Sequence, residues 1–196
     1  MPSLTPERIV DRYIAIAGGG GIEAATIRTI ATDLGVSIGA VQHHYRTREA
    51  LLVDAFRETV RRIDSRIEPR ALRTLSVSSL IRNLHELLPL DAPRRGEAQV
   101  YLQLGTSTHV SEDMRAVRDS SRLALMRWLS AAARRLRIDD DAGQVATAEA
   151  IALLVDGATV RLLDATAGAE VVDAFDGAVR AVVTWHVERP SQGPAS

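Results

Sequence analysis

Residues 26–45, TIRTIATDLGVSIGAVQHHY, decide the fold of this 196-residue chain. Thr26 is a typical helix N-cap, and apolar side chains follow it at the spacing of one helical face as far as Gly35. Glycine at that place ends a helix because it adopts the left-handed conformation easily. Ser37 offers a fresh N-cap only two residues later. Two short helices joined by so short a turn cannot lie antiparallel, so the segment predicts a helix-turn-helix.

The rest of the chain is also helical in pattern. Thr5 and Pro6 predict the start of a first helix, and we expect the glycine run at 18–21 to end it. Thr47 predicts the N-cap of a helix that runs to about residue 67, and Pro93 predicts a break further on. The later helices are expected at roughly 76–89, 95–106, 112–137, 142–166 and 169–187. No alternating strand pattern of useful length occurs, so the predicted fold class is all-α.

The composition excludes several kinds of site and of location. The chain contains no cysteine, which rules out disulfides, thiolate metal sites and cysteine nucleophiles. No apolar run resembles a signal peptide or a membrane span, so we expect a cytoplasmic protein that does not enter membranes. The net charge of −1 does not indicate nucleic acid, but binding depends on a local basic surface rather than on the total.

The helix-turn-helix and the residues after it carry a family resemblance. TIRTIATDLGVSIGAVQHHYRTREAL, residues 26–51, resembles the N-terminal domain of TetR-type bacterial transcriptional regulators. The shared features are the threonine, an Ile-Ala pair, Gly-Val-Ser, small residues at the next helix start, His before an aromatic residue, and a basic-Glu-x-Leu motif. The resemblance covers about 60 residues. It implies a three-helix DNA-binding domain followed by a larger helical bundle for ligand binding and dimerisation.

The side chains around the second helix of the motif suit contact with double-stranded DNA. Hydroxyls, helix N-terminal amides and arginines bind phosphates, while a glutamine side chain can pair with adenine. Gly39 and Ala40 keep the leading edge of that helix slim. Asp33 is the only acid between residues 26 and 48. The predicted DNA-binding residues are Thr26, Arg28, Ser37, Ile38, Gly39, Ala40, Gln42, His43, His44, Thr47 and Arg48.

Two positions depart from the family pattern. Gln42 stands where the family carries a phosphate-contacting aromatic residue, and Arg48 replaces a lysine while keeping its charge. The first change leaves three possibilities for Gln42, namely a phosphate contact, a base contact or neither. Tyr45 stands at the aromatic position that packs into the three-helix core in the family.

The two histidines also raise the possibility of a metal site. His43 and His44 are adjacent, so on a helix their side chains point about 100° apart and cannot chelate one ion together. The sequence has no HExxH motif, and IDDDAG at 138–143 lacks the spacing of a calcium loop and predicts a helix N-cap. No catalytic motif occurs either. We therefore predict no metal, no cofactor and no enzymatic activity.

The C-terminal half has a second resemblance. RRGEAQVYLQL, EAIALLVDGATVRLL and AFDGAVRAVV look like the regulatory domains of the betaine-inhibitor-like branch of the family, whose last two long helices pair with their symmetry mates. This implies a homodimer, although the same apolar stripes could instead fill the core of a monomer. The residues predicted for the dimer interface are Ile151, Val155, Ala158, Leu162, Val171, Phe175, Val179 and Val182.

A pocket for a small-molecule effector is expected among the middle helices. Its candidate residues are polar or large side chains on otherwise aliphatic helices, although a core or surface role is open for each. They are Tyr101, Gln103, His109, Met126, Trp128 and Arg161.

The sequence as a whole therefore predicts a homodimeric repressor that an unidentified effector releases from a palindromic operator. The DNA-binding domain is expected at 1–48, joined through a helix at 48–67 to a regulatory and dimerisation domain at 68–188, with a flexible tail at 189–196. The alternative is a helical ligand- or partner-binding protein whose helix-turn-helix no longer reads DNA. Gln42 is the residue that favours this alternative.

Overall fold

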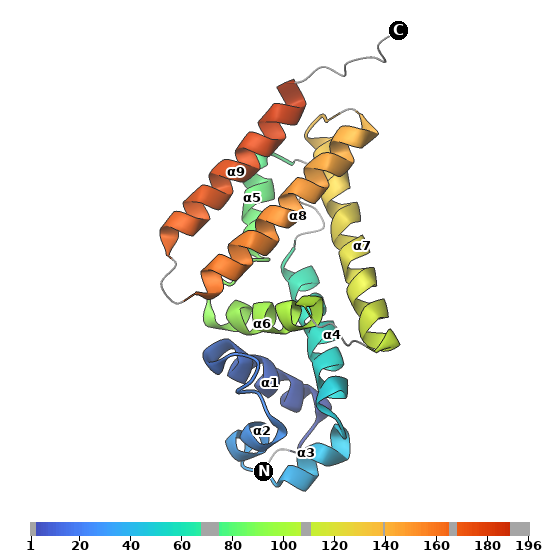
Figure 1. The fold of residues 1–196 in the computed structure, drawn as a ribbon, viewed down its shortest axis with the longest axis vertical. Helices are drawn as coiled ribbons and strands as arrows, with labels where there is room; N and C mark the ends of the chain where they lie inside the picture. The colour runs from blue at the N-terminus through green and yellow to red at the C-terminus, as the bar shows by residue number, and fades with distance from the viewer. Residues whose placement is uncertain (1–2, 68–74, 107–110, 139, 165–167, 189–196) are drawn as a thin grey trace. The chain divides into compact units, whose positions relative to one another are not determined.

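The computed structural model describes residues 3–67, 75–106, 111–138, 140–164 and 168–188. Over these ranges the chain is all-α, with nine helices and no strand (Figure 1). None of the described helices is long and apolar enough to cross a membrane. The helices are α1 Pro6–Gly20, α2 Ile27–Leu34, α3 Ile38–His44, α4 Arg48–Arg66, α5 Val77–His85, α6 Ala92–Thr106, α7 Glu112–Arg135, α8 Asp141–Leu163 and α9 Ala169–Glu188.

The predicted helix starts are confirmed at the atomic level. The Thr26 side chain accepts a hydrogen bond from the Thr29 amide at 3.1 Å, and the Thr47 hydroxyl accepts one from the Ala50 amide at 3.1 Å. Asp140 caps α8 in the same way, which is the role expected for the acids at 138–143. These caps satisfy amide groups that have no partner inside the helix.

One of the expected helix breaks is confirmed and one is wrong. The glycine run at 18–21 ends the first helix, because α1 stops at Gly20 and Gly21, with φ 76°, is its C-cap. Pro93 lies inside the first turn of α6 rather than in a break. Proline is tolerated there because an amide in the first turn has no intrahelical acceptor to lose.

The contacts divide the chain into two compact units. The first combines residues 1–66 with 89–120, and the second combines 67–88 with 121–196. In this division α6 and the start of α7 belong to the same unit as the helix-turn-helix, although they lie in the range 68–188 expected for the regulatory and dimerisation domain.

The first unit is built around α1, which lies against both α4 and α6. Tyr13, Ile14 and Phe56 are fully buried in its core. Gly18 and Gly96 allow the close approach of α1 and α6, since a Cβ at Gly18 would lie 2.8 Å from the Gly96 amide nitrogen.

An ion pair also lies in the interior of this unit. Glu97, on α6, is 3% exposed, and its carboxylate accepts a 2.6 Å hydrogen bond from Arg66 of α4. A buried carboxylate needs such a partner to remain charged. The pair therefore links the end of α4 to the middle of α6.

The second unit packs α8 and α9 side by side and adds α5 and part of α7 (Figure 1). Its core is aliphatic apart from Phe175. A hydrogen bond and an ion pair lie nearer its surface. His85 of α5 lies 2.7 Å from Asp176 of α9, and Arg122 of α7 lies 3.0 Å from Glu149 of α8.

Candidate nucleic-acid interface

The turn between α2 and α3 has the geometry expected of a helix-turn-helix. Gly35 is left-handed, with φ 66° and ψ 33°, and the Val36 amide donates a 3.0 Å hydrogen bond back to the Ala31 carbonyl. The Ser37 hydroxyl then accepts a 3.1 Å hydrogen bond from the Ala40 amide at the start of α3. Gly35 therefore ends α2, and Ser37 caps α3 two residues later, as predicted.

α3 presents a clearly divided surface. Val41 is fully buried and anchors the helix to the core of the first unit, whereas Gln42, His43 and His44 are exposed. At about 100° per residue, Gly39 and His43 lie opposite Val41, on the outermost line of the helix. Because Gly39 has no side chain, the N-terminal part of this outer line is bare backbone that another molecule can approach closely.

Two flanks border this outermost line. Ile38 and Gln42 share one flank, since they are four residues apart, and Ala40 and His44 share the other. Ile38, a large aliphatic side chain, is 40% exposed. Of the predicted DNA-binding residues on α3, only Ala40 is partly shielded.

The charge around α3 is positive on balance. The carboxylate of Asp33, the one acid of this segment, forms an ion pair with Arg12 of α1. Arg28 and Arg46 are exposed and have no acidic partner within 4 Å among the described residues. Arg12 and Arg46 were not among the predicted site residues. Arg46 was recognisable from its charge, but the pairing of Arg12 with Asp33 required the three-dimensional packing of α1 on α2.

Arg48 has a structural role that the sequence did not indicate. Its guanidinium donates a 3.0 Å hydrogen bond to the Ile22 carbonyl and lies 3.3 Å from the Glu23 carboxylate. The side chain therefore ties the start of α4 to the loop before α2, while 46% of its surface stays exposed.

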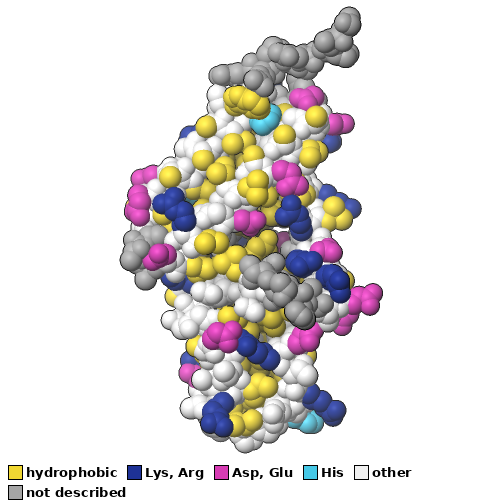
Figure 2. Space-filling view, viewed as in Figure 1, with side chains coloured by type: hydrophobic (Ala, Val, Ile, Leu, Met, Phe, Trp, Pro, Cys, Tyr) yellow, Lys and Arg dark blue, Asp and Glu magenta, His cyan; other side chains and the backbone are white. Residues whose placement is uncertain are grey.

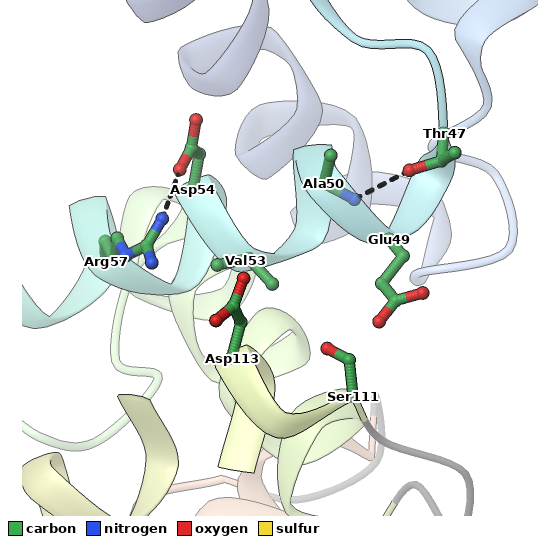
Figure 3. A pocket seen from close by; sticks show the side chains of 8 residues that line it. All are labelled: Thr47, Glu49, Ala50, Val53, Asp54, Arg57, Ser111 and Asp113. Atoms are coloured by element: carbon green, nitrogen blue, oxygen red, sulfur yellow. Dashed lines mark hydrogen bonds and ion pairs between the residues drawn. The ribbon is translucent and has the colours of Figure 1, made fainter. Parts of the chain in front are cut away.

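Tyr45 holds the connection between α3 and α4. It is 5% exposed, which confirms its predicted place in the core, and its hydroxyl donates a 3.1 Å hydrogen bond to Asp54. Burial, with the nearby Asp54 carboxylate adding to it, raises the pKa of Tyr45, so the phenol stays neutral. The same carboxylate accepts a 2.8 Å hydrogen bond from Arg57 (Figure 3).

An open hollow of about 310 Å³ lies beside this connection, between α4 and the start of α7 (Figure 3). Its lining includes the carboxylates of Glu49, Asp54 and Asp113. The lining also includes Arg57, which pairs with Asp54, so its carboxylates outnumber its one cation.

The histidine pair forms no chelating site. The rings of His43 and His44 are 5.5 Å apart and nearly perpendicular. No group of three or more histidine, cysteine, aspartate or glutamate side chains within the described ranges could hold a metal ion.

The structure separates the predicted effector residues. Tyr101 and Gln103 lie on α6 in the first unit, where the Tyr101 ring stacks on Phe56 with the ring centres 6.0 Å apart. Met126 and Trp128 are partly buried on α7 in the second unit. Arg161 is exposed on α8, and His109 lies outside the described residues.

The side chains predicted to form a dimer interface face the core of their own chain. All but Val182 are 7% exposed or less, and Val182 is partly buried against the same cluster. A side chain buried in this way has little surface left for a partner subunit. This burial is what the alternative predicts, in which these stripes fill the core of one chain; it applies to Ile151, Val155, Ala158, Leu162, Val171, Phe175, Val179 and Val182.

Other residues of the same two helices are exposed. On α8, Leu153 is 69% and Val160 57% exposed, and Trp185 of α9 is 51% exposed. Figure 2 shows apolar side chains gathered over α8 and α9. A Cβ added at Gly157 of α8 or at Gly177 of α9 would meet no atom within 4 Å.

Comparison with known sequences gives a family match for the N-terminal part. Residues 9–55 match the model of bacterial regulatory proteins of the tetR family. The chain is 28% identical over 95 residues to the HTH-type transcriptional regulator PksA of Bacillus subtilis, covering 48% of this chain and 46% of PksA. It is 37% identical over 60 residues to the transcriptional repressor KstR of Rhodococcus jostii, covering 31% and 28% of the two chains. The regulator BetI of Vibrio parahaemolyticus is 30% identical over 67 residues, covering 34% of each. The chain thus spans about half or less of the length of these relatives.

Solved structures extend the likeness of the fold to nearly the whole chain. A transcriptional regulator from Rhodococcus sp. Rha1 aligns with a TM-score of 0.78 at 24% identity, covering 95% of this chain and 100% of the other. A regulator from Saccharomonospora viridis in complex with choline aligns with a TM-score of 0.77 at 20% identity, covering 91% and 95%. The all-α fold with an N-terminal helix-turn-helix is therefore that of known transcriptional regulators.

Proposed function

We propose that this chain is a homodimeric transcriptional repressor, on the premise that its residues 9–55 belong to the DNA-binding domain of the tetR family. The observation that carries the proposal is the exposed outer face of α3 beside two arginines without acidic partners among the described residues, Arg28 and Arg46. A helix with a bare leading edge enters the major groove, and the flanking cations and hydroxyls bind the backbone phosphates. The relatives named above are regulators or repressors rather than enzymes.

Dimerisation would use the outer faces of α8 and α9. Leu153 and Trp185 supply exposed apolar area, and Gly157 and Gly177 leave room for a partner helix to approach closely. The helices are those predicted from the sequence, but the stripe is the opposite one. A two-fold dimer presents two identical α3 helices, which requires a palindromic operator.

A small-molecule effector would bind in the second unit. The indole N–H of Trp128 is buried without a hydrogen-bond acceptor among the described residues, and a ligand's acceptor would satisfy it. The likeness of fold to the Saccharomonospora regulator, which was solved in complex with choline, supports a betaine-inhibitor-like C-terminal domain. An effector that binds better to the form unable to span both half-sites would lower operator affinity by population shift.

Binding to the promoter fragment upstream of the chain's own gene tests the proposal. We expect fluorescence anisotropy to show tight, salt-dependent binding. Arg46→Ala should weaken binding to all sequences and lower the slope against log salt by about 0.9 for each phosphate that the arginine neutralises. Arg48→Ala should show the same change plus a decrease in stability, because Arg48 also binds Glu23.

Arg82→Ala, on an exposed position of α5, is the control and should leave binding unchanged. Absence of specific binding to this fragment and to a random duplex library at low salt would sink the repressor proposal. That result would favour a helix-turn-helix that no longer reads DNA.

A further inference from the structure

We infer that Ile38 and Gln42 together read a short A·T-containing step in each half-site, with Ile38 contacting a thymine methyl group and Gln42 an adenine. This inference rests on the proposed function, since it assumes that α3 enters the major groove. The Ile38–Gln42 flank of α3 would then select two bases, one through each side chain.

The exposure of Ile38 is the first observation. Ile38 has 40% of its surface exposed. Its neighbour Gly39 has no side chain to cover it, and the other exposed side chains of α3, those of Gln42, His43 and His44, are polar. An exposed aliphatic side chain beside basic residues suits a partner in which negative charges flank a single apolar group. The major groove offers that combination, because thymine carries a C5-methyl group between two phosphate backbones.

The position of Gln42 is the second observation. It lies one turn beyond Ile38 on the same flank and is also exposed. A glutamine amide both donates and accepts, and this matches the N6 and N7 groups that adenine presents in the major groove. Ile38 and Gln42 are therefore two side chains of different chemistry that face one strip of the groove.

Helix geometry limits how far apart the two bases lie. Four residues of an α-helix rise about 6 Å, and base pairs along DNA are spaced by about 3.4 Å. The adenine and the thymine methyl must therefore lie within about two base-pair steps of each other. The opposite flank carries His44 and leads to Arg46 and Thr47, which suit the phosphate backbone and leave the base edges to the Ile38–Gln42 flank.

Base analogues in the operator give the sharpest test, because the wild-type protein can be used throughout. The operator is first selected from a random duplex library with the full-length protein. Each thymine of the half-site is then replaced by deoxyuridine, which lacks only the methyl group, and each adenine by 7-deazaadenine, which lacks the N7 acceptor. We expect one thymine to give a decrease of about 4-fold in affinity and one adenine within two steps to give a decrease of about 5-fold or more.

The variants assign each contact to its side chain. Ile38→Ala should bind the thymine and deoxyuridine operators equally, whereas Ile38→Leu should keep the preference for thymine. Gln42→Ala should bind the adenine and 7-deazaadenine operators equally. Ser78→Ala on an exposed position of α5 is the control and should keep both preferences.

The outcomes separate this inference from the repressor proposal. A selected operator that tolerates deoxyuridine and 7-deazaadenine everywhere would overturn the inference while leaving sequence-specific DNA binding in place. Sensitivities that persist in Ile38→Ala and Gln42→Ala would also overturn it. Failure to select any sequence would remove the repressor proposal itself.

Discussion

At the scale of single residues, the end of α7 contains a left-handed arginine. Arg137 has φ 68°, and the Ile138 amide that follows it donates a 3.2 Å hydrogen bond to the Ala133 carbonyl. Glycine is favoured at this place in a helix terminus, because a Cβ is strained there. We expect Arg137→Gly to raise the free energy of unfolding by about 0.5–1 kcal/mol in urea denaturation. Arg127→Gly, at an exposed position in the interior of α7, should lower it by about the same amount. Equal decreases in both variants would contradict this interpretation.

A second residue-scale prediction concerns acid stability. Glu58 accepts hydrogen bonds from Arg61 at 2.7 Å and from Arg62 at 2.8 Å, and these lower its pKa to about 2 from the ordinary 4.5. A pKa lowered by folding stabilises the protein above pH 4.5, and this stabilisation disappears as the pH falls towards 2. We expect Glu58→Gln to lower the free energy of unfolding at pH 6 by about 1 kcal/mol or less, because solvent screens the group, and to match wild type near pH 2. Thermal unfolding across this pH range measures it, and a Tm difference that stays constant with pH would contradict the ion-pair origin.

At the scale of elements, the crossing of α1 and α6 depends on missing side chains. A Cβ at Gly18 would lie 2.8 Å from the Gly96 nitrogen and 3.0 Å from the Ala92 carbonyl, whereas a Cβ at Gly19 would meet nothing within 4 Å. We expect Gly18→Ala to destabilise the protein by about 1–3 kcal/mol, since the helices must move apart. Gly19→Ala should be neutral or stabilise it by up to about 1 kcal/mol. Thermal unfolding of the two variants checks this, and a stabilised Gly18→Ala would contradict the close crossing.

The same elements show what the sequence can predict. The helix-turn-helix was predictable because its signals are local: Thr26 and Ser37 bond to amides three residues away, and Gly35 sets its own backbone conformation. The glycine run at 18–21 predicted the end of α1, but the close contact of Gly18 with α6 was not predictable, because α6 is distant in sequence. Gly18 is next to Gly96 only after folding, and no local pattern contains that information.

At the scale of the whole molecule, the sequence of α8 does not determine which of its apolar residues are buried. Leu153, Leu154 and Val155 are consecutive apolar residues, so the helix is apolar on nearly every side and its periodicity does not say which side faces inward. The packing of α9 against it decides this. Val155 is 7% exposed and Leu153 is 69% exposed, although both are aliphatic and two positions apart. The helix could be predicted from the sequence, but its buried face could not.

The exposed apolar face of α8 allows the proposed assembly to be tested. If the outer face of α8 meets its symmetry mate, Leu153→Glu replaces an apolar pair near the two-fold axis with two like charges that have no cationic partner. We therefore expect the dimer to dissociate at micromolar concentration. Because each monomer then holds a single half-site, affinity for a palindromic operator should fall by about 100-fold or more, as it does when two linked binding events become independent. Leu123→Glu is the matched control, as Leu123 is 51% exposed on α7 and should leave both the mass and the affinity unchanged. Sedimentation velocity measures the mass and anisotropy the affinity. A Leu153→Glu protein that stays dimeric would place the interface elsewhere, and a wild-type monomer would exclude a symmetric dimer on the operator.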